Sequence, residues 1–279
     1  MTTRTTDARN TTGIVTALEH AGIVAVIRMK DPARLRAVVD AIAEGGVRAL
    51  ETDLCLTADG ELVVLHDPLL ALGTSLSGWA HERSAREILA AQVRDRHGEL
   101  TDQRPLGLAE LLDLVPDDVL LQLEVKAHAD PALAARTAAR ICASCRAEHD
   151  RLELISFHSS ACATAAARGF RSRLVVWTDH APEWLAAWAR DHRVAGVSIE
   201  HFLLSGEMAG VLRSAGLSVN TGTINEIELA LRAIRLAAPD AICTDRPLEL
   251  RAELDDRLES SADVAGQRAV MAGPAHGRL

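Results

Sequence analysis

The chain has 279 residues, of which 48% are hydrophobic and 25% are charged. This length and composition suffice for one sizeable core and lie in the usual range of an α/β barrel. The formal net charge is −9 and the sequence has no basic cluster. Both features argue against a nucleic-acid partner, because neutralising backbone phosphates requires concentrated lysine and arginine.

No segment of the sequence indicates a membrane span or export. Apolar runs stay below about 18 residues, and the N-terminal stretch MTTRTTDARNTTG lacks the charged-then-apolar order of a secretory signal. The five cysteines are an odd number, which does not favour a disulfide framework. We therefore expect a cytoplasmic protein.

From Gly22 onward, short apolar runs alternate with helical stretches, which predicts parallel βαβ units. The predicted strands are residues 23–28, 49–56, 61–66, 119–126, 152–157, 173–178, 195–199, 217–221 and 241–244. The predicted helices are residues 32–44, 84–92, 107–115, 131–147, 182–190 and 225–237. Because Ala58-Asp59-Gly60 is a turn signal, residues 49–66 are expected to include a hairpin that absorbs the one strand in excess of eight.

These elements favour a (β/α)8 TIM barrel that forms a single domain over residues 13–254. Residues 1–12 and 255–279 are polar or rich in small side chains and lack periodicity. We therefore expect a flexible N-terminus and a flexible C-terminal tail. In such barrels the active site lies at the carboxyl ends of the strands, so polar residues at those ends are the first candidates for function.

Two of the predicted strands carry carboxylates in otherwise apolar sequence. Glu51 and Asp53 are two residues apart, so both side chains point to the same side of the sheet, and Glu124 stands in the strand LLQLEVK. Three carboxylates suit a hard, oxygen-preferring ion such as Mg²⁺ or Ca²⁺ better than zinc. Alternatively, these acids pair with arginines at the barrel mouth, and the spacing alone leaves both interpretations open.

Ordered motifs over much of the chain resemble the glycerophosphodiester phosphodiesterase family. The stretch ETDLCLTADGELVVLHD is similar to the family segment in which Glu-x-Asp precedes Thr-x-Asp-Gly and then His-Asp. RPLGLAELLDLV resembles its Pro-x-Leu-x-Glu helix, QLEVK its Ile-Glu-Ile-Lys strand, and ICTDRP its closing Thr-Asp-x-Pro. The resemblance covers about residues 49–250 and implies a TIM barrel with phosphodiesterase chemistry.

The resemblance also implies roles for individual residues. A divalent metal, Mg²⁺ or Ca²⁺, would be held by Glu51, Asp53 and Glu124, with Glu51 and His66 as catalytic residues and Lys126 near the substrate phosphate. A metal neutralises phosphoryl oxygens, and an imidazole moves a proton at neutral pH. The implied partner is a small phosphorylated substrate, and a homo-oligomer is compatible with this picture.

The sequence departs from the family pattern at two places. The family has His-Arg at the end of its first strand, where this chain has Ile27-Arg28, so the first catalytic histidine is absent. The tryptophan of a late family strand aligns with Gly222, which would open that wall of the pocket. Trp177 at the end of another strand is a candidate to replace this apolar wall and to bind substrate.

The first unit has a second likeness. Residues 14–51 resemble the opening of keto-deoxy-phosphogluconate aldolases, which places Arg28 as an anion-binding residue and Glu51 as a proton-transfer group. Such an aldolase needs a Schiff-base lysine, and Lys126 is the sole internal candidate. Glu124 lies on the same strand face and would favour the protonated amine, so this chemistry is not favoured.

These observations lead to one main hypothesis and two alternatives. The main hypothesis is metal-dependent hydrolysis of a phosphodiester, glycerophosphodiester-like or a specialised small substrate, in which Arg28 and Lys126 bind phosphoryl oxygens and His66 transfers a proton. The first alternative is a repurposed metal-dependent lyase, aldol or isomerase reaction on a phosphorylated or carboxylated carbonyl compound. The second is a non-catalytic binder of anions or metal ions.

Overall fold

Eight parallel strands close into a barrel in the computed structural model, which describes residues 22–27 and 32–257. The strands follow one another around the barrel as β1 (Gly22–Val26), β2 (Ala49–Leu56), β5 (Leu120–Lys126), β6 (Leu152–Ser156), β7 (Arg171–Val176), β8 (Gly196–Ile199), β9 (Ser218–Thr223) and β10 (Ala241–Thr244). Pairing of β10 with β1 and of β1 with β2 completes the circle. The predicted TIM barrel is therefore confirmed.

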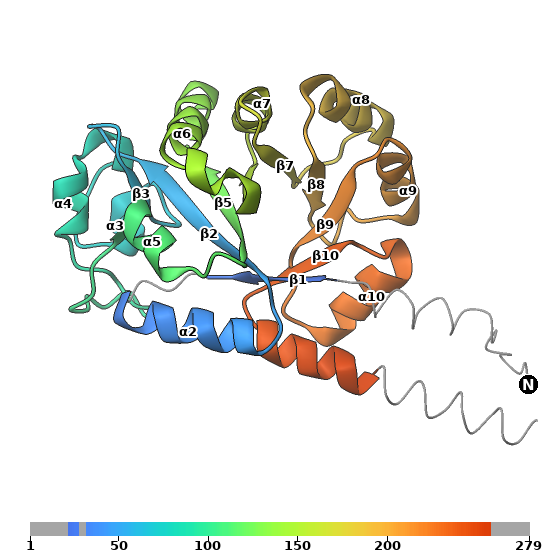
Figure 1. Cartoon of the computed structure of the whole chain (residues 1–279), viewed down its shortest axis with the longest axis horizontal. Helices are drawn as coiled ribbons and strands as arrows, with labels where there is room; N and C mark the ends of the chain where they lie inside the picture. The colour runs from blue at the N-terminus through green and yellow to red at the C-terminus, as the bar shows by residue number, and fades with distance from the viewer. Residues whose placement is uncertain (1–21, 28–31, 258–279) are drawn as a thin grey trace, which may run out of the picture.

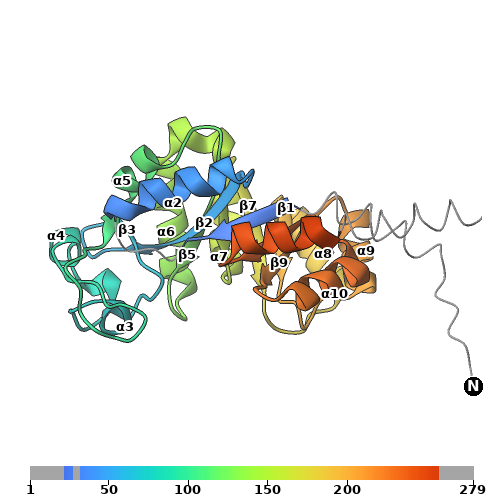
Figure 2. The same cartoon turned by 90° about the horizontal axis from the view of Figure 1, so that it is seen from below.

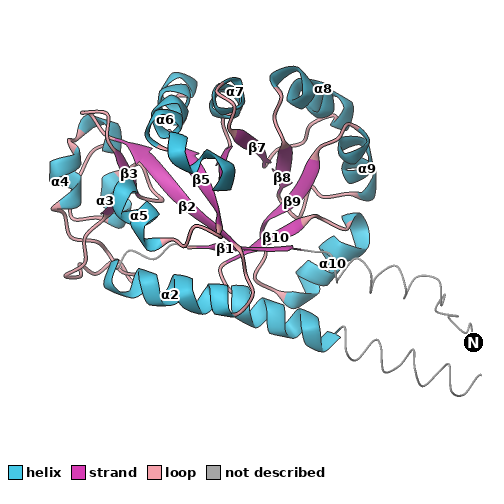
Figure 3. Cartoon of the chain, viewed as in Figure 1, coloured by secondary structure: helices cyan, strands magenta, loops and turns pink. Residues whose placement is uncertain are grey.

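Helices surround the strands on the outside of the barrel (Figures 1 and 3). They are α2 (Pro32–Glu44), α6 (Pro131–Ser144), α7 (Ser159–Ala167), α8 (Pro182–His192), α9 (Gly206–Ser214) and α10 (Ile227–Ala237), and a 3-10 helix, η2 (Arg146–Arg151), follows α6. A further helix spans residues 247–257 and, with α2, covers the side of β1, as Figure 2 shows from below. None of the described helices combines the length and hydrophobicity of a membrane span.

An insertion between β2 and β5 carries the additional strands. In it, β3 (Leu62–Val64) pairs antiparallel with the end of β2, and β4 (Leu106–Gly107) pairs antiparallel with β3. The expected hairpin is confirmed, with the turn at Gly60, whose φ of 82° favours glycine. The short helices α3 (Leu70–Gly73), η1 (Ala80–Glu82), α4 (Ala85–Leu89) and α5 (Leu108–Leu114) complete this insertion, on the left in Figure 1.

Several helices were absent from the predicted set. In α7, with sequence SSACATAAA, the small side chains leave little contrast between an apolar and a polar face, so no clear helical period is visible. The helix α9, which buries Met208 and Leu212, was also absent from the prediction. The predicted helix 131–147 ends at Ser144, and η2 takes up the next residues. The helix over residues 247–257 continues beyond position 254, where the barrel domain was expected to end. The two expected flexible ends otherwise lie outside the described residues.

The alternation of side chains along each strand separates the core from the barrel interior. Leu50 and Leu54 of β2 and Leu121 and Leu123 of β5 are buried in the main hydrophobic core, which joins the strands to the helices. Burying one such side chain contributes about 1.5–3 kcal/mol relative to its exposure. The side chains at the alternate positions of these strands, such as Gln122, are polar and face the barrel interior.

A buried polar network fills the barrel interior. Arg173 of β7 contacts both carboxylate oxygens of Glu153 at 3.2 Å and donates to the backbone oxygen of Val197 at 3.0 Å. Gln122 donates to Glu153 at 2.6 Å. The guanidinium passes Gly196, where a Cβ would lie 2.7 Å from Arg173 Nη1. Arg173 and Glu153 are almost fully buried, so the pair is desolvated and each charge depends on the other.

We predict that Glu153→Leu lowers the free energy of unfolding by about 3–5 kcal/mol, because Arg173 would keep a buried charge without its carboxylate. Urea unfolding followed by circular dichroism measures this change. The double variant Glu153→Leu/Arg173→Met is expected to recover part of the loss, since neither charge remains. A single variant as stable as the wild type would contradict the prediction.

Candidate metal site and the pocket around it

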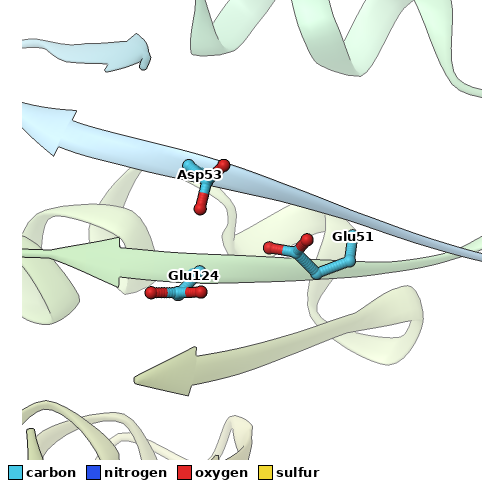
Figure 4. A group of neighbouring side chains, drawn as sticks. All are labelled: Glu51, Asp53 and Glu124. Carbon is cyan, nitrogen blue, oxygen red and sulfur yellow. The ribbon is translucent and has the colours of Figure 1, made fainter. Parts of the chain in front are cut away.

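Three buried carboxylates gather where β2 and β5 lie side by side (Figure 4). Asp53 and Glu124 are direct partners in the parallel pairing of these strands, and Glu51 lies two residues before Asp53. One oxygen from each of the three lies within 4.8 Å of the others, and the residues are 4–8% exposed. The structure therefore brings together the three carboxylates that the sequence singled out.

Among the described residues, Lys126 forms ion pairs with two of these carboxylates. Its Nζ lies 3.0 Å from Asp53 Oδ1 and 2.5 Å from Glu124 Oε1. Burial alone would lower the pKa of Lys126, but the negative charges of Glu124 and Asp53 outweigh it and raise the pKa above its ordinary value. The ammonium is thus held in its protonated form, and Asp53 and Glu124 pair with a lysine rather than with arginines.

The donor set fits a divalent cation. Burial raises the pKa of Glu124, and the charge of Asp53 raises it further although Lys126 opposes the shift. Asp53 and Glu124 share the single ammonium of Lys126, which leaves negative charge in a buried place that a doubly charged ion would offset. All three ligands offer oxygen, as Mg²⁺ and Ca²⁺ prefer. Glu51, Asp53 and Glu124 could hold such an ion.

The carboxylates line one side of a pocket of about 150 Å³ at the carboxyl ends of the strands. Its wall is formed by Val26, Glu51, Asp53, His66, Glu124, Lys126, Ile155, Phe157, Val175, Ser198, Glu200, Thr221, Gly222, Thr223 and Cys243. His66 follows β3, and the backbone N–H of Leu65 donates to the backbone carbonyl oxygen of Asp53 at 3.1 Å, which ties this segment to β2. His66 Nδ1 lies 3.0 Å from Asp67 Oδ1.

The opposite wall carries polar residues that the sequence reasoning missed. Ser198 and Glu200 lie two residues apart at the end of β8 and both line the pocket. The same two-residue spacing that singled out Glu51 and Asp53 is present here, and it was the signal that could have revealed them. Gly222 of β9 does not open this wall as expected, because the Glu200 carboxyl group occupies the space beside its Cα.

Three more residues were singled out from the sequence, and the structure describes two of them. Trp177 is 59% exposed and does not line this pocket, whereas Phe157 does, so the expectation that Trp177 replaces an apolar wall is not supported. Ile27 is buried in the core with Val39 and Ile42, and it is Val26 of β1 that lines the pocket. Arg28 lies outside the described residues.

Comparison with known proteins agrees with this architecture. The model of the glycerophosphoryl diester phosphodiesterase family matches residues 36–249. A phosphodiesterase of Oleispira antarctica, solved with the product sn-glycerol-3-phosphate, is 20% identical with a TM-score of 0.70, covering 85% of this chain and 98% of that one. A glycerophosphodiester phosphodiesterase of Thermotoga maritima is also 20% identical, with a TM-score of 0.64, covering 84% and 98%.

A curated relative matches a shorter part of the chain. The protein YqiK of Bacillus subtilis (strain 168) is 33% identical over 85 residues, which are 30% of this chain and 35% of that protein. The chain thus matches about a third of the length of this relative. The structural neighbours establish the barrel, and the family model extends over most of it. The chain belongs to the glycerophosphoryl diester phosphodiesterase family.

Proposed function

We propose that this protein hydrolyses a small phosphodiester, glycerophosphodiester-like in its chemistry, with the help of a divalent metal ion. The observation that supports the proposal is the presence, in one pocket, of three buried carboxylates, a protonated lysine and a histidine. Together these groups can hold a cation, neutralise a phosphoryl group and move a proton. The pocket of about 150 Å³ suits a small substrate.

Each residue then has a distinct role. Glu51, Asp53 and Glu124 would hold Mg²⁺ or Ca²⁺, and the bound ion would supply positive charge to the phosphoryl oxygens. Lys126 keeps its proton and offers N–H donors to the same anionic group. Arg28, outside the described residues, is proposed to bind a phosphoryl oxygen as well.

His66 is the proposed proton acceptor. With a proton on Nδ1, the imidazole donates to Asp67 Oδ1 at 3.0 Å, which fixes the ring and leaves Nε2 free to accept a proton from the attacking water. Its side chain is 41% exposed, so water reaches the ring. The neighbouring Asp67 also stabilises the imidazolium that forms.

A carbonyl reaction through a Schiff base is disfavoured. Lys126 contacts two carboxylates and is held protonated, so its amine lacks the free electron pair that attack on a carbonyl requires. The likeness of residues 14–51 to aldolases overlaps the phosphodiesterase family match from residue 36 onward. The phosphodiesterase proposal therefore takes precedence.

We predict that Glu51→Gln lowers kcat/KM on glycerophosphodiesters by at least about 100-fold and weakens Mg²⁺ or Ca²⁺ binding, because a neutral amide replaces a charged ligand. Titration calorimetry measures the affinity, and a chelator should abolish wild-type turnover. Glu61→Gln, which changes an exposed carboxylate of the β2–β3 turn region, serves as the matched control. Full activity in excess chelator would contradict metal dependence.

We further predict that His66→Ala lowers kcat by about 10²–10⁴-fold, as expected for the loss of a general base. Metal affinity and the melting temperature should stay near their wild-type values, because the ring is partly exposed and its hydrogen bond is to Asp67, which is not among the proposed metal ligands. Steady-state kinetics and calorimetry test both statements. Wild-type turnover in the His66→Ala variant would remove His66 from the mechanism.

A further inference from the structure

We propose that Glu200 is the proton donor to the leaving alcohol, and this assignment rests on the proposed phosphodiester hydrolysis. Glu200 directly follows β8, and β8 is the fourth strand on from β2 around the eight-stranded barrel, in either direction. The side chain therefore enters the pocket from the wall across from the carboxylates of β2 and from His66, which is tied to β2.

Gly222 leaves the space that the Glu200 carboxyl group occupies. A Cβ at Gly222 would lie 2.6 Å from the carboxyl carbon of Glu200 and 2.6 and 2.7 Å from its two oxygens. These separations are far shorter than van der Waals contact, so any larger residue at position 222 would displace the carboxyl group. Gly222 on β9 has no side chain, and the carboxyl group of Glu200, which follows β8, occupies the space that a side chain would fill.

The surroundings of Glu200 suit a group that carries a proton. Within the described residues, no hydrogen bond or ion pair of its carboxyl group is found, and partial burial raises its pKa. The hydroxyl of Ser198, on the same side of the strand, is buried and has no hydrogen-bond partner among the described residues. Two polar groups are therefore available to a bound molecule on this wall.

The proton balance of hydrolysis requires a donor and an acceptor. The oxygen of water forms a bond to phosphorus as its proton passes to His66 Nε2. The bond from phosphorus to the leaving oxygen breaks, and that oxygen takes the electron pair together with the proton of Glu200. Glu200 ends as a carboxylate and His66 as an imidazolium. His66 then releases its extra proton to solvent and Glu200 takes one from solvent, which restores both groups. Attack and departure occur on opposite sides of phosphorus, which suits two groups on opposite walls.

The role of Glu200 as a proton donor is tested by comparing kcat/KM for two substrates with different leaving groups. An alkoxide is a strong base and needs a proton as it leaves, whereas a nitrophenolate leaves without one. In Glu200→Gln, we expect kcat/KM for glycerophosphoglycerol to fall by about 10²–10⁴-fold. The value for bis(4-nitrophenyl) phosphate should change by less than about threefold, and metal affinity measured by calorimetry should be unchanged. Glu207→Gln, at an exposed position of α9, is the control and should leave both substrates unaffected.

Gly222→Ala provides a second variant that keeps the carboxyl group. The new methyl group should push the flexible end of Glu200 aside and give the same selective loss on the alkyl diester, of smaller size. Circular dichroism and the melting temperature verify that both variants fold.

If the wild type hydrolyses phosphodiesters, two results would still overturn the role of Glu200 as the proton donor. Equal losses on the alkyl and aryl diesters in Glu200→Gln would indicate a positioning role. A rise in KM confined to glycerophosphoethanolamine would mean that Glu200 recognises an ammonium group instead of donating a proton. If the wild type cleaves neither diester in the presence of Mg²⁺ or Ca²⁺, the proposed function itself fails, and the assignment of Glu200 fails with it.

Discussion

The two-residue alternation of side chains, imposed on strands that close into a barrel, is the constraint on which the site depends. Residues on one side of each strand must enter the barrel interior, while those on the other side pack against helices. On β2 this sends Leu50 and Leu54 to the core, and Glu51 and Asp53 to the pocket. The hydrophobic core thus fixes the strands, and the strands in turn fix where the carboxylates lie.

Charge is distributed in two layers inside this barrel. Deeper along the strands, Arg173 and Glu153 neutralise one another; Glu153 accepts a further hydrogen bond from Gln122, and Arg173 donates one to the backbone oxygen of Val197. At the carboxyl ends, Asp53 and Glu124 share Lys126, so carboxylates outnumber the ammonium. The lower layer is electrically balanced and stabilises the barrel. The upper layer keeps a negative excess, which a divalent metal ion would offset.

The pocket combines groups from both sides of the barrel. The insertion between β2 and β5 brings His66 beside the carboxylates, because β3 pairs with the end of β2. Across the mouth, Glu200 reaches over Gly222 and adds a second group able to exchange a proton. Of the residues of β1, only apolar Val26 lines the pocket, and the proton transfer proposed above therefore relies on His66 and Glu200.

The sequence by itself indicated the barrel and most of its strands, because the alternation of apolar runs with helical stretches is a local property. Spacing also singled out Glu51 and Asp53, but the role of the three carboxylates as metal ligands was implied by the family resemblance. The sequence missed α7, whose small side chains give no amphipathic contrast, and it expected Trp177 in the pocket. The closeness of Lys126 to Glu124 follows from their spacing on one strand, but only the tertiary structure decided that Lys126 also contacts Asp53, and that Glu200 fills the space beside Gly222. Both contacts join residues on neighbouring strands that are distant in the chain, and their geometry depends on strand register and packing, which spacing along one strand does not encode.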